Sequence, residues 1–232
     1  MKPTDTPQKI VIFGDSQLAS LAHFYFKHDS PHTVVGFTVD RDYVKEDQYE
    51  GLPIVPFEEV EQHFSVDEHH MFLPISFKQM SHLRRRKYEA AKEKGYRLAS
   101  YVSSRATTWP DLDIGDNCFI FEDNTIQPFV KIGDNCILWS GNHIGHHTTI
   151  GNHVFITSHV VISGACQIDD HCFFGVNATV RDETHIAEGT LVAMGATIIK
   201  DTQPYEIHLG QKSKLMDKKS MDLDSLSHKT GG

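Results

Sequence analysis

The second half of this chain repeats a large apolar residue at every sixth position, and this pattern constrains the fold most. The period matches neither an amphipathic helix (3.6 residues) nor a half-buried strand (two residues). It is typical of a solenoid in which each hexapeptide forms one short parallel strand and one corner of a triangular coil. We therefore predict a solenoid of about five coils over residues 106–202. The repeated residues, called anchors below, are Ile114, Ile120, Ile126, Ile132, Leu138, Ile144, Ile150, Ile156, Ile162, Ile168, Phe174, Val180, Ile186, Val192 and Ile198.

A second column of residues, two positions before each anchor, supports the same interpretation. Nearly all of its members are small or compact, as an inward position near a tight corner requires. Turn formers such as Gly115-Asp116-Asn117 lie between the columns, because Gly, Asn and Asp tolerate the positive φ that sharp corners demand. The sequence contains no CxxC pair and so gives no indication of a zinc site or of redox chemistry. The second column contains every cysteine of the chain, which predicts compact core residues at Cys118, Cys136, Cys166 and Cys172.

Residues 1–105 lack the repeat and have the pattern of a small α/β domain. Predicted strands alternate with predicted helices, which is typical of a parallel, Rossmann-like sheet. After the solenoid, residues 203–232 form a C-terminal segment, with a loop at 203–210 and a polar, partly helical tail at 212–227 that caps the solenoid. The predicted strands of the first domain are 9–14, 34–40, 70–75 and 98–102, and its predicted helices are 17–28, 57–64 and 79–94.

The end of the first strand offers a candidate binding loop, because ligands of parallel sheets bind beyond the carboxyl ends of the strands. Gly14, Asp15 and Ser16 precede a helix, whose N-terminus attracts anions, and Asp40 ends the second strand. The full GxGxxG fingerprint is absent, since Ser16 and Ala19 replace the later glycines. The residues alone leave two interpretations open, a nucleotide site or an ordinary tight turn.

The overall charge and hydropathy exclude some classes of protein. The formal net charge of −9 argues against a nucleic-acid-binding protein, which is normally basic. No secretory signal is recognisable, and no stretch approaches the roughly 20 apolar residues of a membrane span. We therefore expect a cytoplasmic protein.

Histidines are concentrated in the middle coils and are the residues best suited to acid–base chemistry near neutral pH. The phase of the repeat separates them. The position three residues after an anchor is shared by His147, His153, His159 and His171. His146 instead lies two residues after Ile144 and points outward beside a glycine. On the residues alone, an outward histidine is more often a solvated surface residue than a base.

The combination of both halves resembles the bacterial sugar-nucleotide acetyltransferases of the PglD/NeuD type, which are left-handed β-helix acyltransferases. Residues 142–151, Asn-His-Ile-Gly-His-His-Thr-Thr-Ile-Gly, are similar to the family's catalytic stretch, and His146 takes the place of its general base. The resemblance implies a homotrimer with acetyl-CoA between the solenoids of two subunits and no metal. It further implies direct transfer to a sugar amine, with a backbone N–H that stabilises the oxyanion.

The same resemblance implies roles for further residues. His147 and His143 are possible supports of His146, and the nucleotide-linked sugar is held by Gly14, Asp15, Ser16 and Asp40. The acetyl-CoA groove is implied to contain Ser163, Gly164, Gly195, Ala196, Lys212 and Lys214.

Two departures from the family pattern concern the site. His147 stands where the family usually has an acidic residue that orients the base, and Gly210-Gln211-Lys212-Ser213-Lys214 replaces the usual Gly-x-Pro-Ala-Lys.

The expected activity is N-acetylation of a nucleoside-diphosphate-linked amino-deoxy sugar, for cell-surface polysaccharide synthesis. The alternatives are O-acetylation of a sialic-acid-like sugar, a zinc hydro-lyase resembling γ-class carbonic anhydrase, and a non-catalytic sugar-nucleotide-binding scaffold.

A basic run and a tryptophan also call for an interpretation. We expect Arg84-Arg85-Arg86-Lys87 to form the solvated face of a helix. Trp139 is expected to be an outward aromatic residue near the groove, in contact with a subunit or with the sugar.

Overall fold

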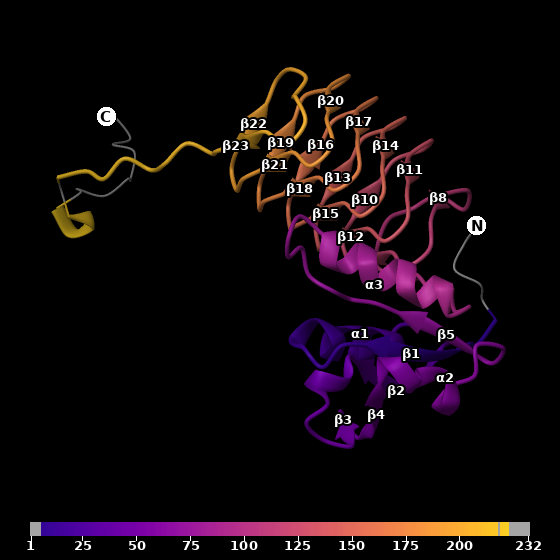
Figure 1. Ribbon diagram of the computed structural model, residues 1–232. Coiled ribbons are helices and arrows are strands. Elements are labelled where there is room, and N and C mark those ends of the chain that lie inside the picture. Colours follow the sequence, from indigo (N-terminus) through magenta and orange to yellow (C-terminus); the bar gives the residue numbers. More distant parts are fainter. Residues whose placement is uncertain (1–5, 218, 223–232) are drawn as a thin grey trace, which may run out of the picture.

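The computed structural model describes residues 6–217 and 219–222 and divides them into an α/β domain and a solenoid (Figure 1). The first domain contains a sheet of six strands in the order β3-β4-β2-β1-β5-β6, parallel except for the antiparallel pair β3 and β4. Within the described part of the chain, no helix has the length and apolar character needed to cross a membrane. The strands are β1 (Lys9–Phe13), β2 (Thr33–Val39), β3 (Gln48–Tyr49), β4 (Leu52–Pro56), β5 (His69–Phe72) and β6 (Arg97–Leu98).

The predicted Rossmann-like sheet is confirmed, with two differences. β3 and β4 were missed, because Gly51, Pro53 and Pro56 interrupt the apolar pattern there. The predicted strand 98–102 is divided between two sheets. β6 ends at Leu98, and β7 (Tyr101–Val102) already pairs with the solenoid strand β9 (Phe119–Ile120).

The helices cover both faces of this sheet. α1 (Gln17–His28) buries Ala19, Ala22 and Phe26 in a cluster that also includes solenoid side chains. The predicted helix 79–94 begins later, as α3 (His82–Glu93), because Gln79, Met80 and Ser81 all have positive φ. α3 packs Tyr88 and Ala91 on the other face of the sheet. The remaining short elements are η1 (Arg41–Tyr43), η2 (Phe57–Glu59), α2 (Val60–His63) and η3 (Ser220–Asp222).

The solenoid has three flat sheets, and its strands pair with strands one coil away in the parallel register Ile132↔Ile150. Sheet 1 contains β8 (Asp113–Ile114), β11 (Lys131–Ile132), β14 (Thr149–Ile150), β17 (Gln167–Ile168) and β20 (His185–Ile186). Sheet 2 contains β7, β9, β12 (Ile137–Leu138), β15 (Phe155–Ile156), β18 (Phe173–Phe174), β21 (Leu191–Val192) and β23 (Ile207–His208). Sheet 3 contains β10 (Thr125–Ile126), β13 (His143–Ile144), β16 (Val161–Ile162), β19 (Thr179–Val180) and β22 (Thr197–Ile198).

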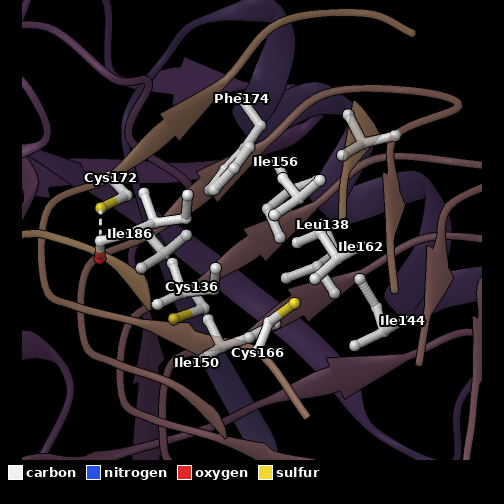
Figure 2. Close-up of a cluster of buried hydrophobic side chains, with 14 of the residues drawn as sticks. Cys136, Leu138, Ile144, Ile150, Ile156, Ile162, Cys166, Cys172, Phe174 and Ile186 are labelled. Atoms are coloured by element: carbon white, nitrogen blue, oxygen red, sulfur yellow. Dashed lines mark hydrogen bonds between the residues drawn. The ribbon is translucent and has the colours of Figure 1, made fainter. Parts of the chain in front are cut away.

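Both predicted columns point into the solenoid. The anchors from Ile120 to Ile198 are at most 3% exposed and form one continuous core with the small residues of the second column. Figure 2 shows Cys136, Cys166 and Cys172 among the isoleucines of this core. β23 lies in the predicted loop 203–210, where it adds a further strand to sheet 2. Residues 211–217 are exposed and extend away from the solenoid (Figure 1), so this part of the predicted tail does not cap it. Residues 223–227 lie outside the described residues.

The third residue after each anchor, called the corner slot below, adopts the left-handed conformation. From Asn117 to Gly195 every corner slot has a positive φ, between 52° and 66° for the residues other than glycine. The turn glycines that precede it serve another purpose. A Cβ on Gly115 would lie 2.7 Å from the backbone nitrogen of Asp134, so close stacking of the coils, not positive φ, requires glycine there.

The α/β domain packs on sheet 2 and on the adjoining corner between sheets 1 and 2. The outward side chains of sheet 2, including Phe119, Ile137 and Phe155, are buried in one cluster with Phe26 and Phe72 of the first domain. At the corner, α3 contacts the slots Asn117, Asn135, His153 and His171 or their neighbours.

The prediction that residues 84–87 form the solvated face of a helix is wrong for Arg84. Its side chain is fully buried, and its guanidinium donates hydrogen bonds to the carbonyls of Ile75, Asn135, His153 and Val154 at 2.9–3.2 Å. Burial lowers the pKa of Arg84 to about 10, which leaves it charged at neutral pH. The contacts join the first domain to two successive coils.

Replacing Arg84 should destabilise the protein strongly. Arg84→Ala removes the donor to the buried carbonyls of Asn135 and His153, and we expect a loss of about 3 kcal/mol or more in the free energy of unfolding. Denaturant unfolding of the variant measures it. The matched control is Arg86→Ala, since Arg86 is exposed and its guanidinium donates a hydrogen bond to the side chain of Gln79 rather than to the solenoid. Equal stability of both variants would contradict the role assigned to Arg84.

A column of stacked histidines lies beside Arg84. The ring of His171 stacks between those of His82 and His153, with centroid distances of 4.1 and 4.9 Å. His153 bonds the side chain of Asn135 at 2.9 Å, and His171 Nδ1 bonds the Met80 carbonyl at 3.0 Å. Burial, His171 and Arg84 lower the pKa of His153 to about 4, and burial and His82 lower the pKa of His171.

This column should make the protein acid-sensitive. Because the folded pKa of His153 is about 4 and the unfolded value is about 6.5, the unfolded state binds more protons between these values. We therefore expect about 2 to 3 kcal/mol of stability to be lost as the pH falls from 6.5 to 4. His153→Asn continues the column Asn117–Asn135 and should reduce this loss in pH-dependent unfolding. His63→Asn, at an exposed site, should leave it unchanged.

Candidate active site

His146 lies at the corner between sheets 3 and 1 and is exposed. Its imidazole covers Gly164 of the next coil, where a Cβ would lie 2.7 Å from His146 Cε1 and 2.9 Å from Nε2. The carbonyl of His146 accepts a hydrogen bond from the N–H of Ala165 at 2.7 Å. Gly164 therefore provides the space that the ring occupies.

Neighbouring side chains hold His146 from the preceding coil and from the same corner. Its backbone N–H donates to Gln127 Oε1 at 2.8 Å, and its Nδ1 lies 3.1 Å from Nδ1 of His147. His147 also packs against the ring of Phe129, with a centroid distance of 4.6 Å. The sequence analysis did not single out Gln127 or Phe129. Both precede the histidine that they contact by about one coil, and this spacing could have identified them.

The structure brings together only some of the predicted acetyl-CoA residues. Ser163 and Gly164 share the corner of His146, whereas Gly195 and Ala196 lie at the corner between sheets 2 and 3, nearer the C-terminal end. Lys212 and Lys214 belong to the exposed segment that leaves the solenoid (Figure 1). The N–H of Gly164 has no acceptor among the described residues.

The predicted nucleotide loop lies at the carboxyl edge of two adjacent strands. Phe13 pairs with Thr38, which places Gly14, Asp15 and Ser16 near Asp40. Asp40 forms an ion pair with Lys87 of α3, and Lys87 lies 5.5 Å from the ring centroid of Phe13. Lys87 was predicted to be part of the solvated helix face; instead it supplies a positive charge at this edge.

The two candidate regions do not meet within one chain. The first domain covers sheet 2, whereas His146 lies at the corner between sheets 3 and 1, which is the corner opposite sheet 2 in the triangular coil. A ligand held by the first domain of one chain is thus on the far side of the solenoid from that chain's own His146.

Two further residues that the sequence analysis singled out, Trp139 and His143, make contacts within their own chain. Trp139 stacks on Phe121 of its own chain, with a centroid distance of 4.7 Å and parallel rings, at the border of the first domain. His143 is a half-buried outward residue of β13 and pairs in register with Thr125 and Val161. No group of three or more metal-ligating side chains occurs among residues 6–217 and 219–222.

Comparison with known proteins shows which solved structures share this fold. A family model described as bacterial transferase hexapeptide (six repeats) matches residues 112–146. PerB from Caulobacter crescentus, solved in complex with CoA and GDP-perosamine, is similar with a TM-score of 0.77 at 20% identity over 86% of this chain and 92% of PerB. The acetyltransferase domain of PglB from Neisseria gonorrhoeae has a TM-score of 0.73 at 18% identity, over 86% and 95%.

The chain has the fold of these proteins. It is a left-handed parallel β-helix preceded by a Rossmann-like domain, as predicted. A His-to-Asn variant of perosamine N-acetyltransferase from Caulobacter crescentus is also similar, with a TM-score of 0.64 at 17% identity over 86% of this chain and 92% of that one. No curated protein sequence matches the chain.

The cysteines are structural, and their thiols should not react in the folded protein. All four are buried, and burial raises the pKa of Cys118 and Cys172, the latter to about 12. We expect no reaction with a thiol-specific disulfide reagent under native conditions and complete reaction after denaturation. Rapid native labelling of any one of them would contradict this assignment.

Proposed function

We propose that this protein is an acetyl-CoA-dependent N-acetyltransferase that acts on the amino group of a nucleotide-linked amino-deoxy sugar. The observation that carries the proposal is the exposed imidazole of His146 over Gly164 in a left-handed β-helix. Its Nε2 is the ring nitrogen left open, because Nδ1 faces His147. Support comes from similar proteins whose complexes contain CoA and GDP-perosamine.

The reaction requires one base and one oxyanion donor. The sugar amine attacks the thioester carbonyl, a C–N bond forms, the C–S bond breaks, and His146 Nε2 takes the proton from the nitrogen. That proton then serves to protonate the departing thiolate of CoA. The unpaired N–H of Gly164, next to the ring, is suited to stabilise the oxyanion of the intermediate. The four cysteine thiols are buried, so none of them can accept the acyl group; these residues are Cys118, Cys136, Cys166 and Cys172.

Separation of the two regions supports a composite site in a homotrimer. Since the first domain of one chain lies away from its own His146, we propose that the nucleotide sugar is presented by a different subunit. In this arrangement Gly14, Asp15, Ser16 and Lys87 hold the nucleotide. Ser163 and Gly164 lie along the CoA groove with Gly195 and Ala196 further along it, and Lys212 and Lys214 approach CoA phosphates. We also propose a cytoplasmic location and a role in cell-surface polysaccharide synthesis.

A turnover assay tests the proposal. CoA release from acetyl-CoA is measured with UDP-, dTDP- and GDP-linked amino sugars, beginning with GDP-perosamine. We expect His146→Asn to lower kcat by about 10²-fold or more. The matched control is His159→Asn, because His159 is an exposed imidazole over Gly141 at a different corner.

Other outcomes would favour the competing functions. Near wild-type turnover in His146→Asn would refute the assignment of the base. Transfer only to hydroxyl acceptors would indicate O-acetylation of a sialic-acid-like sugar, and activity that depends on stoichiometric zinc would indicate a hydro-lyase. Binding of a nucleotide sugar without a thermal shift by acetyl-CoA would favour a non-catalytic scaffold.

A further inference from the structure

The Nδ1 atoms of His146 and His147 lie within hydrogen-bond distance of each other, 3.1 Å apart. A neutral imidazole has one N–H donor and one bare acceptor nitrogen. At this distance, one Nδ1 therefore carries the proton and donates it to the other. The arrangement of the pair determines which ring nitrogen of His146 is free to accept a proton from a substrate.

Only one of the two arrangements suits a base. If His147 donates, His146 carries its own proton on Nε2, and the nitrogen that faces solvent cannot accept another. If His146 donates, its Nε2 is bare and available beside Gly164, and His147 carries its proton on Nε2. The second arrangement also keeps the hydrogen bond intact when His146 becomes an imidazolium.

We propose that His147 is a positioning residue whose Nδ1 accepts a hydrogen bond from His146 Nδ1–H, which fixes the tautomer and orientation of the base. This inference rests on the proposed acetyltransferase function. His147 thus performs with a neutral ring what an acidic residue would do with a charge. Its test compares two chemically opposite replacements in the same corner slot.

The local backbone and packing hold His147 in the required place. It occupies a corner slot with φ of 59°, its N–H donates to the Pro128 carbonyl at 3.2 Å, and Phe129 packs on its ring. Among the residues that the structure describes, the others in contact with the pair are Gln127, Gly164 and Ala165, and all three are uncharged.

The solenoid itself shows which substitutions the corner slot accepts. Phe129 and Glu183 occupy the same slot of this corner, one coil before and two coils after His147, with φ of 66° and 55°. His147→Phe keeps an aromatic ring and removes the acceptor. His147→Glu supplies a carboxylate acceptor. Both variants therefore use side chains that the slot already holds in this chain.

Steady-state kinetics give the first test. We expect His147→Phe to lower kcat by about tenfold or more with the KM for acetyl-CoA unchanged, and His147→Glu to restore most of it. In His147→Glu the acid limb of the kcat profile should move to higher pH, because a neighbouring carboxylate favours the protonated imidazole. A kcat of His147→Phe within about twofold of wild type, or equal loss in both variants, would overturn the proposal.

A second measurement does not depend on activity. Exchange of the imidazole C2 hydrogen, followed by mass spectrometry with fragmentation that assigns the exchange to His146 and separates it from His143 and His147, reports the pH at which this ring is half-protonated. We expect this pH to be lowest in His147→Phe, intermediate in wild type and highest in His147→Glu. The same pH in all three would overturn the role of His147. Absence of CoA release in wild type would instead refute the acetyltransferase, and the exchange order would still decide the pairing.

Discussion

The stacking of anchor side chains inside the solenoid is the constraint on which the other features depend. Each anchor lies on the anchor of the next coil, so the direction of every residue in the hexapeptide follows from its distance to the nearest anchor. A residue two positions after an anchor points outward at a corner, as His146 does. A residue three positions after it must adopt a left-handed backbone, as His147 does.

This backbone requirement explains much of the unusual histidine content of the solenoid. Asn, Asp and His enter the left-handed region more easily than most residues, and four histidines occupy corner slots. Their environments then diverge. His153 and His171 are buried against α3, whereas His147 and His159 are exposed at other corners. The same local rule thus places identical side chains in a domain interface and in a candidate active site.

The sequence was sufficient for the solenoid, because the solenoid follows from a strict period. At the site, the family resemblance singled out Ser163 and Gly164, and the structure has both at the corner of His146. Gln127 and Phe129, which also contact His146 and His147, were not predicted, because nothing in the repeat apart from their spacing distinguishes them from other outward residues. Residues outside the repeat were less predictable. Arg84 and Lys87 look like a solvated helix face, and only the packing of α3 on the solenoid shows that one is buried and the other is paired with Asp40. β23 was missed because it follows the last anchor.

The buried guanidinium of Arg84 has a consequence for the evolution of the chain. Its acceptors in the solenoid, the carbonyls of Asn135, His153 and Val154, come from two coils that are eighteen residues apart. Arg84 therefore acts as a gauge of coil length at this corner: a coil lengthened or shortened between these residues would move one acceptor away. The corner of His146 lies between Asn135 and His153, so an insertion in this coil would disturb the interface with the first domain as well as the candidate base.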